Sequence, residues 1–294
     1  MTSSVTTVSL QATGRTRRRL RVNRVMEALG TTAAYLAVAV LVLVVVSVVV
    51  RAWPALSIQL FTQTPNLVGG PGGGISSAIV GSALIVAMAT GMALPVGVLS
   101  AIYMTEFAPP RIAGVIQLAL DMLNGTPTII TGIFVYGFLV LGHLQSAYAG
   151  AFALAIVMLP LVTRATQEVL LLVPDTLREA SLALGVSRWR TVLGVILPSA
   201  LGGILTGTVI AMARAAGETA PLLFTCSIFG PALSTDVTHA LPNIPVLIFV
   251  YSEQPDPSLH ERAWAAALVL MVFILVASLG ARALLARQQR KMTR

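Results

Sequence analysis

Six long apolar stretches divide this chain of 294 residues. Each approaches or exceeds the roughly 20 apolar residues that a helix needs to cross the hydrocarbon core of a bilayer. The pattern therefore predicts an all-α integral membrane protein, a polytopic bundle of about six transmembrane helices. The predicted spans are Leu29–Val50, Ser76–Thr105, Ile112–Leu141, Ala147–Thr163, Leu193–Met212 (alternatively extended to Phe229) and Arg262–Ala286.

The connections between these spans differ in charge. The first and last predicted outer loops, Arg51–Ile75 and Ser227–Glu261, contain Arg51 as their single arginine or lysine. Most of the other basic residues lie before the first span, after the last span, and in the second and fourth connections. Because Lys and Arg of membrane proteins concentrate on the cytoplasmic side, we predict that both termini are cytoplasmic.

This layout predicts three regions: a basic cytoplasmic segment at 1–28, a transmembrane domain at 29–286 and a basic cytoplasmic tail at 287–294. A basic head before an apolar run is also typical of a secretory signal peptide. The run Leu29–Val50 is longer than an ordinary signal-peptide core, and no A-x-A pattern follows it. We therefore expect an uncleaved first span and a multi-pass protein of the plasma or inner membrane.

Composition agrees with this class and excludes others. The chain is 56% hydrophobic and 10% charged, whereas a soluble domain carries about 25% charged residues. The net charge of +8 lies mainly at span ends rather than on an aromatic-rich face, which argues against nucleic-acid binding. One cysteine, Cys226, excludes an intrachain disulfide, and the one lysine, Lys291, cannot complete a P-loop. His143, His239 and His260 lack metal-ligand spacing, so no metal site is expected.

The fourth connection combines a helix pattern with a basic, aromatic end. Pro174–Thr176 can start a helix, because Thr and Asp suit caps and first turns. Gly185 then ends the helix, and Arg188–Arg190 follows with a tryptophan at its centre. A short amphipathic helix in a polar loop either lies on the membrane surface or enters a groove of a partner. Four residues at helical spacing form its apolar stripe: Leu177, Ala180, Ser181 and Leu184.

The fifth predicted span carries two opposite charges. Arg214 and Glu218 stand four residues apart, which places them on one helix face within reach of each other. An arginine inside a bilayer costs at least about 2.5–3.5 kcal/mol, so it should face a cavity or a partner. The residues leave two readings open. One is an ion pair that joins helices, and the other is an anion contact in which Glu218 orients the guanidinium.

Two more charged residues near spans have competing interpretations. Asp121 stands beside the polar, proline-containing patch Asn124–Thr128, which predicts a bend that lines a cavity. The same aspartate can alternatively pair with Arg111. Arg164 precedes Glu168 by four residues, so these two can form an ion pair.

A composite motif in the fourth connection resembles the EAA loop of importer-type ABC permeases. Glu179–Ser181, three residues, Gly185, nine residues and Val195–Pro198 follow the family pattern, EAA, three residues, G, nine residues, I-x-L-P. Ser181 and Val195 depart mildly from it. In that family the loop forms a coupling helix that sits in a groove of the ATPase subunit. The resemblance implies a cytoplasmic coupling loop at about 164–193 and these docking residues: Arg178, Glu179, Ala180, Ser181, Gly185, Leu197 and Pro198.

The segment Ala213–Leu222 is similar to the corresponding part of the permeases of the high-affinity phosphate importer, in particular the A-type subunits. The similarity covers about residues 70–230. It implies the type I ABC importer permease architecture, and it implies that these residues serve phosphate passage: Arg214, Glu218, Thr219 and Arg164. Other stretches that agree are Gly74–Gly81, Gly132–Tyr136, Leu159–Arg164 and Val173–Glu179.

Residues and resemblance together predict the permease subunit of an ATP-driven phosphate importer, which forms half of the transmembrane pathway. The implied partners are a homologous second permease, two copies of an ATP-binding subunit, an extracytoplasmic phosphate-binding protein and membrane lipid. ATP is used by the partner subunits, so no catalytic residue and no bound cofactor are expected in this chain.

Three alternative functions compete with this prediction. A permease for sulfate or molybdate shares the same class. An ion-coupled secondary transporter would leave the EAA loop without a purpose, and no clear inverted repeat is present. A membrane-embedded hydrolase would need GxSxG, HExxH or paired intramembrane aspartates, and the sequence contains none of them.

Overall fold

The computed structural model describes residues 14–66, 72–227, 230 and 232–292. Within them all regular secondary structure is helical, as predicted. The α-helices are α1 Arg15–Ala52, α2 Ile58–Thr62, α3 Ser76–Ile102, α4 Pro110–Gly125, α5 Thr128–Val135, α6 Ala147–Leu171, α7 Asp175–Ala183, α8 Arg188–Thr191, α9 Leu197–Ala216, α10 Ala220–Thr225, α11 Ile244–Glu253 and α12 Pro257–Met292. Shorter elements are the 3₁₀-helix η1 Trp53–Ala55 and the π-helices η2 Tyr103–Phe107, η3 Tyr136–Val140 and η4 Val192–Ile196.

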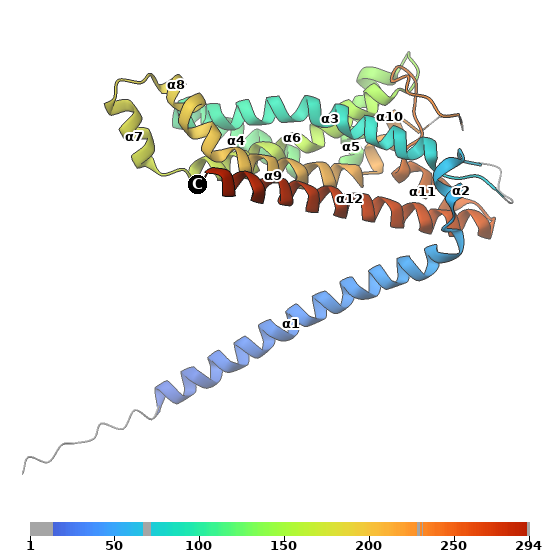
Figure 1. The fold of residues 1–294 in the computed structure, drawn as a ribbon, viewed down its shortest axis with the longest axis horizontal. Helices are drawn as coiled ribbons and strands as arrows, with labels where there is room; N and C mark the ends of the chain where they lie inside the picture. Colours follow the sequence, from blue (N-terminus) through green and yellow to red (C-terminus); the bar gives the residue numbers. More distant parts are fainter. Residues whose placement is uncertain (1–13, 67–71, 228–229, 231, 293–294) are drawn as a thin grey trace, which may run out of the picture. The chain divides into compact units, whose positions relative to one another are not determined.

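The chain divides into two compact units, 1–50 and 51–294. The described part of the first unit is the α1 helix up to Val50. In the second unit α3 packs on α6, α6 on α9, and α9 on α12, so that four long helices form a bundle. Figure 1 shows α7 and α8 at one end of this bundle and α2, α10 and α11 at the other.

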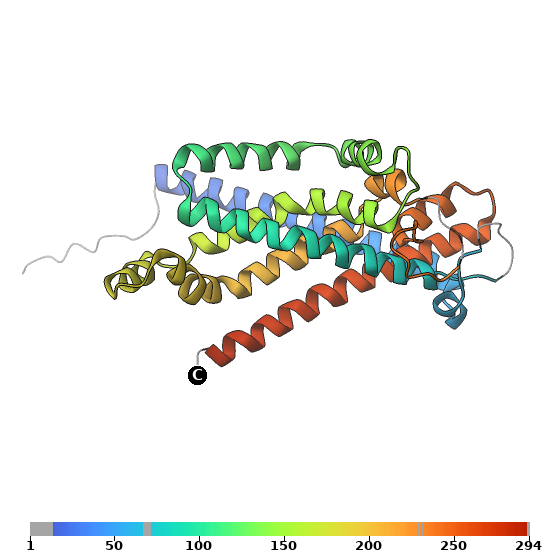
Figure 2. The same cartoon turned by 90° about the horizontal axis from the view of Figure 1, so that it is seen from above.

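The predicted number of spans agrees with the structure when one bent pair is counted as a span. Five helices are long and apolar enough to cross a membrane by themselves, and the bent pair is the sixth candidate. The pair consists of Pro110–Gly125 and Thr128–Val140, which meet at 98°. Figure 2 shows this change of direction on one side of the bundle, where the green ribbon turns after α4.

Two predicted span ends differ from the ends of the helices. The fourth span is predicted to end near Thr163, whereas α6 continues to Leu171. The extension of the fifth span to Phe229 fails because α9 ends at Ala216, and Gly217 takes the C-cap position.

Glycines let the central helices approach each other closely. A Cβ added to Gly203 of α9 would lie 2.5 Å from the Val169 Cγ1 of α6, and one added to Gly207 would overlap the Cβ of Ala165. Membrane helices commonly approach each other closely where two small residues stand four positions apart. The α6–α9 contact therefore depends on the absence of side chains at two positions of α9.

The short helix α5 packs against α10 in the same manner. A Cβ on Gly132 would lie 2.8 Å from the Pro221 Cα. This contact holds the second half of the broken span against the segment that follows Arg214. Packing of α5 on both α6 and α10 therefore fixes the position of the break.

Candidate functional site

A cavity of about 190 Å³ lies at the break of the third span. The break follows from local chemistry. Thr126 precedes a proline and has extended backbone angles, φ −73° and ψ 129°, because the ring of Pro127 disfavours a helical residue before it. The α4 helix therefore ends at Gly125, and α5 begins at Thr128 in a new direction. The cavity is lined by Leu123, Asn124, Thr126, Pro127, Thr128, Thr131, Ile156, Val157, Leu161 and Arg214.

The polar groups of this cavity are mostly hydrogen-bond donors, or hydroxyls able to donate. The hydroxyl of Thr126 is engaged, because it donates to the Met122 carbonyl at 2.7 Å. For Asn124, Thr128 and Thr131 no side-chain hydrogen bond occurs within the described residues. One arginine, one amide and two hydroxyls thus converge without a carboxylate in the lining, which suits a small anion.

Arg214 reaches the cavity from the last turn of α9. It lies about 24 Å along the helix from Pro198 at 1.5 Å per residue, and the residue is exposed at the surface of this chain. None of the ion pairs among the described residues includes Arg214. Its guanidinium donors are therefore available to a ligand or a partner.

The predicted pairing of Arg214 with Glu218 is wrong. The i, i+4 argument assumed one continuous helix, whereas α9 ends at Ala216 and Glu218 lies beyond the Gly217 C-cap. Thr219 occupies the N-cap position of α10 without a side-chain capping bond. Neither Glu218 nor Thr219 belongs to the cavity lining.

Arg164 pairs across helices rather than along its own. Its guanidinium forms an ion pair with Asp121 of α4. The expected alternatives, Arg164 with Glu168 and Asp121 with Arg111, do not form among the described residues. Gln117 donates to the same aspartate at 3.3 Å. Arg164 thus holds the first half of the broken span against α6 and is absent from the cavity lining.

The segment Asp175–Thr191, which comprises α7 and α8, forms the predicted loop helix and its basic exit. Asp175 lies in the first turn of α7, and Gly185 ends the helix with φ +76°, a backbone conformation that favours glycine. Ser181 is buried and its hydroxyl is 2.9 Å from that of Thr191, which ties α7 to α8. The remaining motif residues of the helix are exposed, as are most of its apolar neighbours: Glu179, Ala180, Leu177, Leu182 and Leu184.

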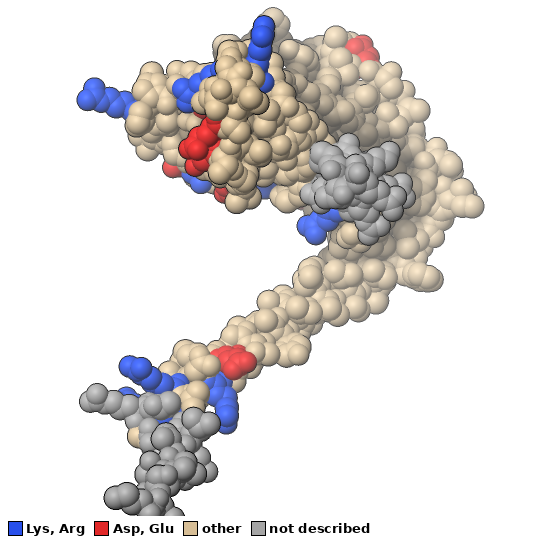
Figure 3. Space-filling model, turned by 60° about the vertical axis from the view of Figure 1, so that its left-hand side comes forward, with Lys and Arg blue, Asp and Glu red and all other residues tan. Residues whose placement is uncertain are grey.

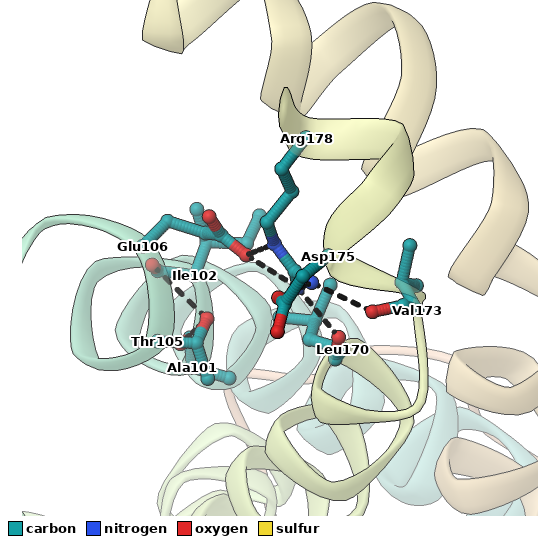
Figure 4. Close-up of polar contacts among 8 residues, drawn as sticks. All are labelled: Ala101, Ile102, Thr105, Glu106, Leu170, Val173, Asp175 and Arg178. Atoms are coloured by element: carbon teal, nitrogen blue, oxygen red, sulfur yellow. Dashed lines mark hydrogen bonds and ion pairs between the residues drawn. The ribbon is translucent and has the colours of Figure 1, made fainter. Parts of the chain in front are cut away.

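Arg178, in contrast, points into this chain. Figure 4 shows its guanidinium between the Glu106 carboxylate and the carbonyl oxygens of Leu170 and Val173. Arg178 is predicted to be a docking residue, but its side chain packs against its own chain and does not form part of an exposed surface. Leu197 and Pro198, the last motif residues, form the first turn of α9, directly after the π-helix η4.

Glu106 is the residue that the sequence reasoning missed. Its side chain is 6% exposed and faces Arg178 from 72 residues away in the sequence. In the sequence, Glu106 is recognisable as an acidic residue at the end of an apolar span, just before Pro109–Pro110. Such a residue indicates a buried ion pair, but the pattern does not identify its partner.

Both basic and acidic side chains are exposed at the α7–α8 end of the bundle, on the face that Figure 3 shows. At the opposite end most charges are acidic, and the exceptions include Arg51, whose guanidinium lies 4.9 Å from the centroid of the Trp264 ring. There Asp236 accepts hydrogen bonds from the backbone and hydroxyl of Thr238, at 3.0 and 2.6 Å, which lower the pKa of the carboxyl group. The nearby His239 ring is 2.9 Å from the same aspartate. Among the described residues no group of three or more His, Cys, Asp and Glu side chains could hold a metal ion.

The fold places the protein in a known class. Residues 93–290 match the family model of the binding-protein-dependent transport system inner membrane component. Among solved structures, the chain is similar to one described as the inward facing conformation of the MetNI methionine ABC transporter, with a TM-score of 0.60 and 16% identity over 72% of this chain and 95% of that one. A second, an amino acid ABC transporter, gives a TM-score of 0.51 with 19% identity over 74% and 92%. These likenesses define an importer-type ABC permease fold.

Curated relatives narrow the class to one family. The phosphate transport system permease protein PstA of Yersinia pestis is 38% identical over 252 residues, 85% of each chain. The protein of the same name from Haemophilus influenzae is 40% identical over 80% of this chain and 84% of its own length. PstA 1 of Mycobacterium tuberculosis H37Rv is 38% identical over 71% and 68%. The chain belongs to the PstA family of phosphate transport permeases.

Proposed function

We propose that this chain is the permease subunit of an ATP-driven phosphate importer and forms half of its transmembrane pathway. The observation that carries the proposal is the guanidinium of Arg214, which lines the cavity at the break of the third span and has no carboxylate partner among the described residues. The names of the relatives supply the anion, since they are phosphate transport permeases.

In the proposed mechanism an extracytoplasmic phosphate-binding protein delivers the anion to the outer end of the bundle. The cavity then replaces part of the hydration shell of phosphate with the arginine fork, the Asn124 amide and the hydroxyls of Thr128 and Thr131. Charge-assisted hydrogen bonds from arginine to phosphate are strong and oriented. Since Arg214 is exposed at the surface of this chain, a homologous second permease completes the wall of the pathway.

The exposed apolar residues of α7 support the second half of the proposal, docking of an ATPase subunit. Leu177 is 42% exposed and Leu184 is 84% exposed, although both are large apolar side chains. Unpartnered apolar residues on a short helix fit a protein groove. We therefore name Asp175–Thr191 the coupling segment. Two ATPase subunits close on ATP, move the coupling segments of the two permeases, and switch the cavity from one side of the membrane to the other.

A permease for sulfate or molybdate remains the second candidate, because the cavity donors do not by themselves distinguish tetrahedral oxyanions. Competition between unlabelled anions and radioactive phosphate distinguishes a phosphate permease from a sulfate or molybdate permease. With radioactive phosphate at a saturating concentration, a tenfold excess of unlabelled phosphate should lower radioactive uptake about tenfold, whereas the same excess of sulfate or molybdate should leave it unchanged.

The decisive variant is Arg214→Gln, which removes the positive charge and keeps a polar side chain of related shape. We expect phosphate uptake to fall at least a hundredfold, while the amount of assembled complex and the basal ATP hydrolysis stay within twofold of wild type. Arg282→Gln is the matched control, since Arg282 is exposed on α12 away from the cavity. Uptake at the wild-type rate by Arg214→Gln would exclude the anion contact.

A further inference from the structure

A buried carboxylate at the end of the second span holds the arginine that precedes the EAA motif. The side chains of Glu106 and Arg178 are 6% and 19% exposed. The Nε and Nη2 atoms of Arg178 both donate to the Glu106 Oε1, at 3.2 and 2.9 Å (Figure 4). Charges that are largely removed from solvent are stable only when they satisfy each other, so this contact specifies the position of Arg178.

The same guanidinium closes the end of α6. Its Nη2 donates to the Leu170 carbonyl at 2.9 Å, and its Nη1 donates to the Val173 carbonyl at 2.6 Å. Carbonyls at the end of a helix have no partner within the helix, and a basic side chain can supply one. The bond from Nη1 to Asp175 contributes little, because that carboxylate is 88% exposed. One side chain of α7 thus connects the ends of α3 and α6.

The backbone around Glu106 is specialised for this contact. Residues Tyr103–Phe107 form the π-helix η2 at the end of α3, and single π turns inside helices often occur at functional sites. The next residue, Phe107, contacts α8: its ring centroid is 5.8 Å from that of Trp189, and the guanidinium of Arg188 lies 5.5 Å from it. Both helices of the coupling segment therefore contact the last turn of the second span.

We propose that Glu106 is a positioning residue of the coupling segment. Through Arg178 it fixes the direction in which α7 leaves the bundle, and it transmits a displacement of α7 to the second span. Without this contact, α7 keeps the bonds from Arg178 to the Leu170 and Val173 carbonyls, the Ser181–Thr191 contact with α8 and its packing on η4. Transmission during transport rests on the proposed function, whereas the positioning of α7 does not.

Positioning is tested on the chain alone. Spin labels on Leu99→Cys in α3 and Ala183→Cys in α7, both exposed positions, should give a narrow distance distribution in the purified protein. In the Glu106→Ala background we expect the distribution to broaden at least twofold. The labelled protein with native Glu106 and with Glu168→Ala, a substitution at an exposed glutamate of α6, is the matched control and should stay narrow. An unchanged width in Glu106→Ala overturns the proposal.

Transmission is tested in the full complex in proteoliposomes, where phosphate uptake and ATP hydrolysis are measured together. Glu106→Ala should lower the phosphate moved per ATP hydrolysed at least tenfold, with ATPase co-purification within twofold of wild type. The double variant Glu106→Ala/Arg178→Ala should be no worse than the poorer single variant, because the two residues act through one contact. An unchanged ratio, or independent effects of the two substitutions, contradicts transmission.

Two further outcomes are separable. If Glu106→Ala does not fold, Glu106→Gln, which removes the negative charge that holds Arg178, takes its place in both measurements with the same direction of change expected. Failure of both variants to fold means that the pair serves folding only, and this overturns the proposal. If wild-type complex moves no phosphate, the proposed function is wrong, while the spin-label measurement still decides whether Glu106 positions α7.

Discussion

At the scale of single residues, two arginines show how one side chain serves opposite purposes. Arg178 donates to Glu106, Asp175 and two backbone carbonyls and is 19% exposed. Arg214 lines a cavity and forms no ion pair within the described residues. A guanidinium whose donors are occupied fixes helices to each other, whereas one with free donors can bind an anion. The type of residue is the same, and only the surroundings assign the role.

Glu179 gives the prediction at this scale. The residue is exposed on α7 and has no hydrogen bond or ion pair in the described part of the chain, so a substitution should change the stability of this chain by less than about 0.5 kcal/mol. Glu179→Lys should nevertheless lower the amount of ATPase that co-purifies with the tagged permease at least fivefold, because it reverses a charge on the docking surface. The matched control is Glu253→Lys, an exposed glutamate at the other end of the bundle. Undiminished co-purification would contradict docking at this helix.

At the scale of elements, the functional geometry comes from interruptions of helices. Pro127 breaks the third span and opens the cavity. Gly217 ends α9 three residues after Arg214. Gly207 then lets α9 lie close enough to α6 for the bundle to pack. A break exposes backbone groups that lipid cannot satisfy, so it persists only where the protein surrounds a polar space.

Gly207→Ala is the prediction for this close contact. The added methyl group would overlap the Cβ of Ala165, and overpacking of this kind costs about 1–3 kcal/mol. We expect a lower thermal unfolding temperature of the detergent-purified protein. Gly91→Ala provides the comparison, because a Cβ there meets nothing within 4 Å and alanine favours helix over glycine by about 1 kcal/mol. Equal unfolding temperatures for the two variants would contradict the packing argument.

At the scale of the whole molecule, charge is distributed unevenly between the two ends of the bundle. The α7–α8 end carries basic side chains such as Arg111, Arg188 and Arg190, all exposed. The other end carries Asp236, Glu253 and Glu261 without a nearby excess of bases. Because basic loops stay on the cytoplasmic side, the coupling segment should lie in the cytoplasm.

This orientation is measurable with a membrane-impermeant maleimide. Ser187→Cys, at the start of α8, should react only after the membrane is permeabilised. Thr235→Cys, in the last outer loop, should react in intact cells. Both positions are exposed, and the native Cys226 is fully buried and provides an unreactive background. The reverse labelling pattern would invert the proposed topology.

The sequence by itself determined the features that depend on neighbouring residues. A membrane helix satisfies its backbone within its own segment, so apolar runs revealed the spans, and Asn124–Thr128 revealed the break in one of them. Gly185 ended the loop helix as its position predicted, with the positive φ that glycine tolerates. Motif spacing indicated the family, which the curated relatives confirm.

Only the tertiary structure decided which charges meet. Arg164 contacts Asp121 rather than the i+4 residue Glu168, and Arg178 contacts Glu106 across 72 residues. Local spacing measures distance along one helix, whereas these pairs depend on how separate helices pack. The same holds for Arg214: the end of α9 separates it from Glu218, and the break of another span gives it a cavity. Burial and proximity belong to the assembled bundle, and no local pattern encodes them.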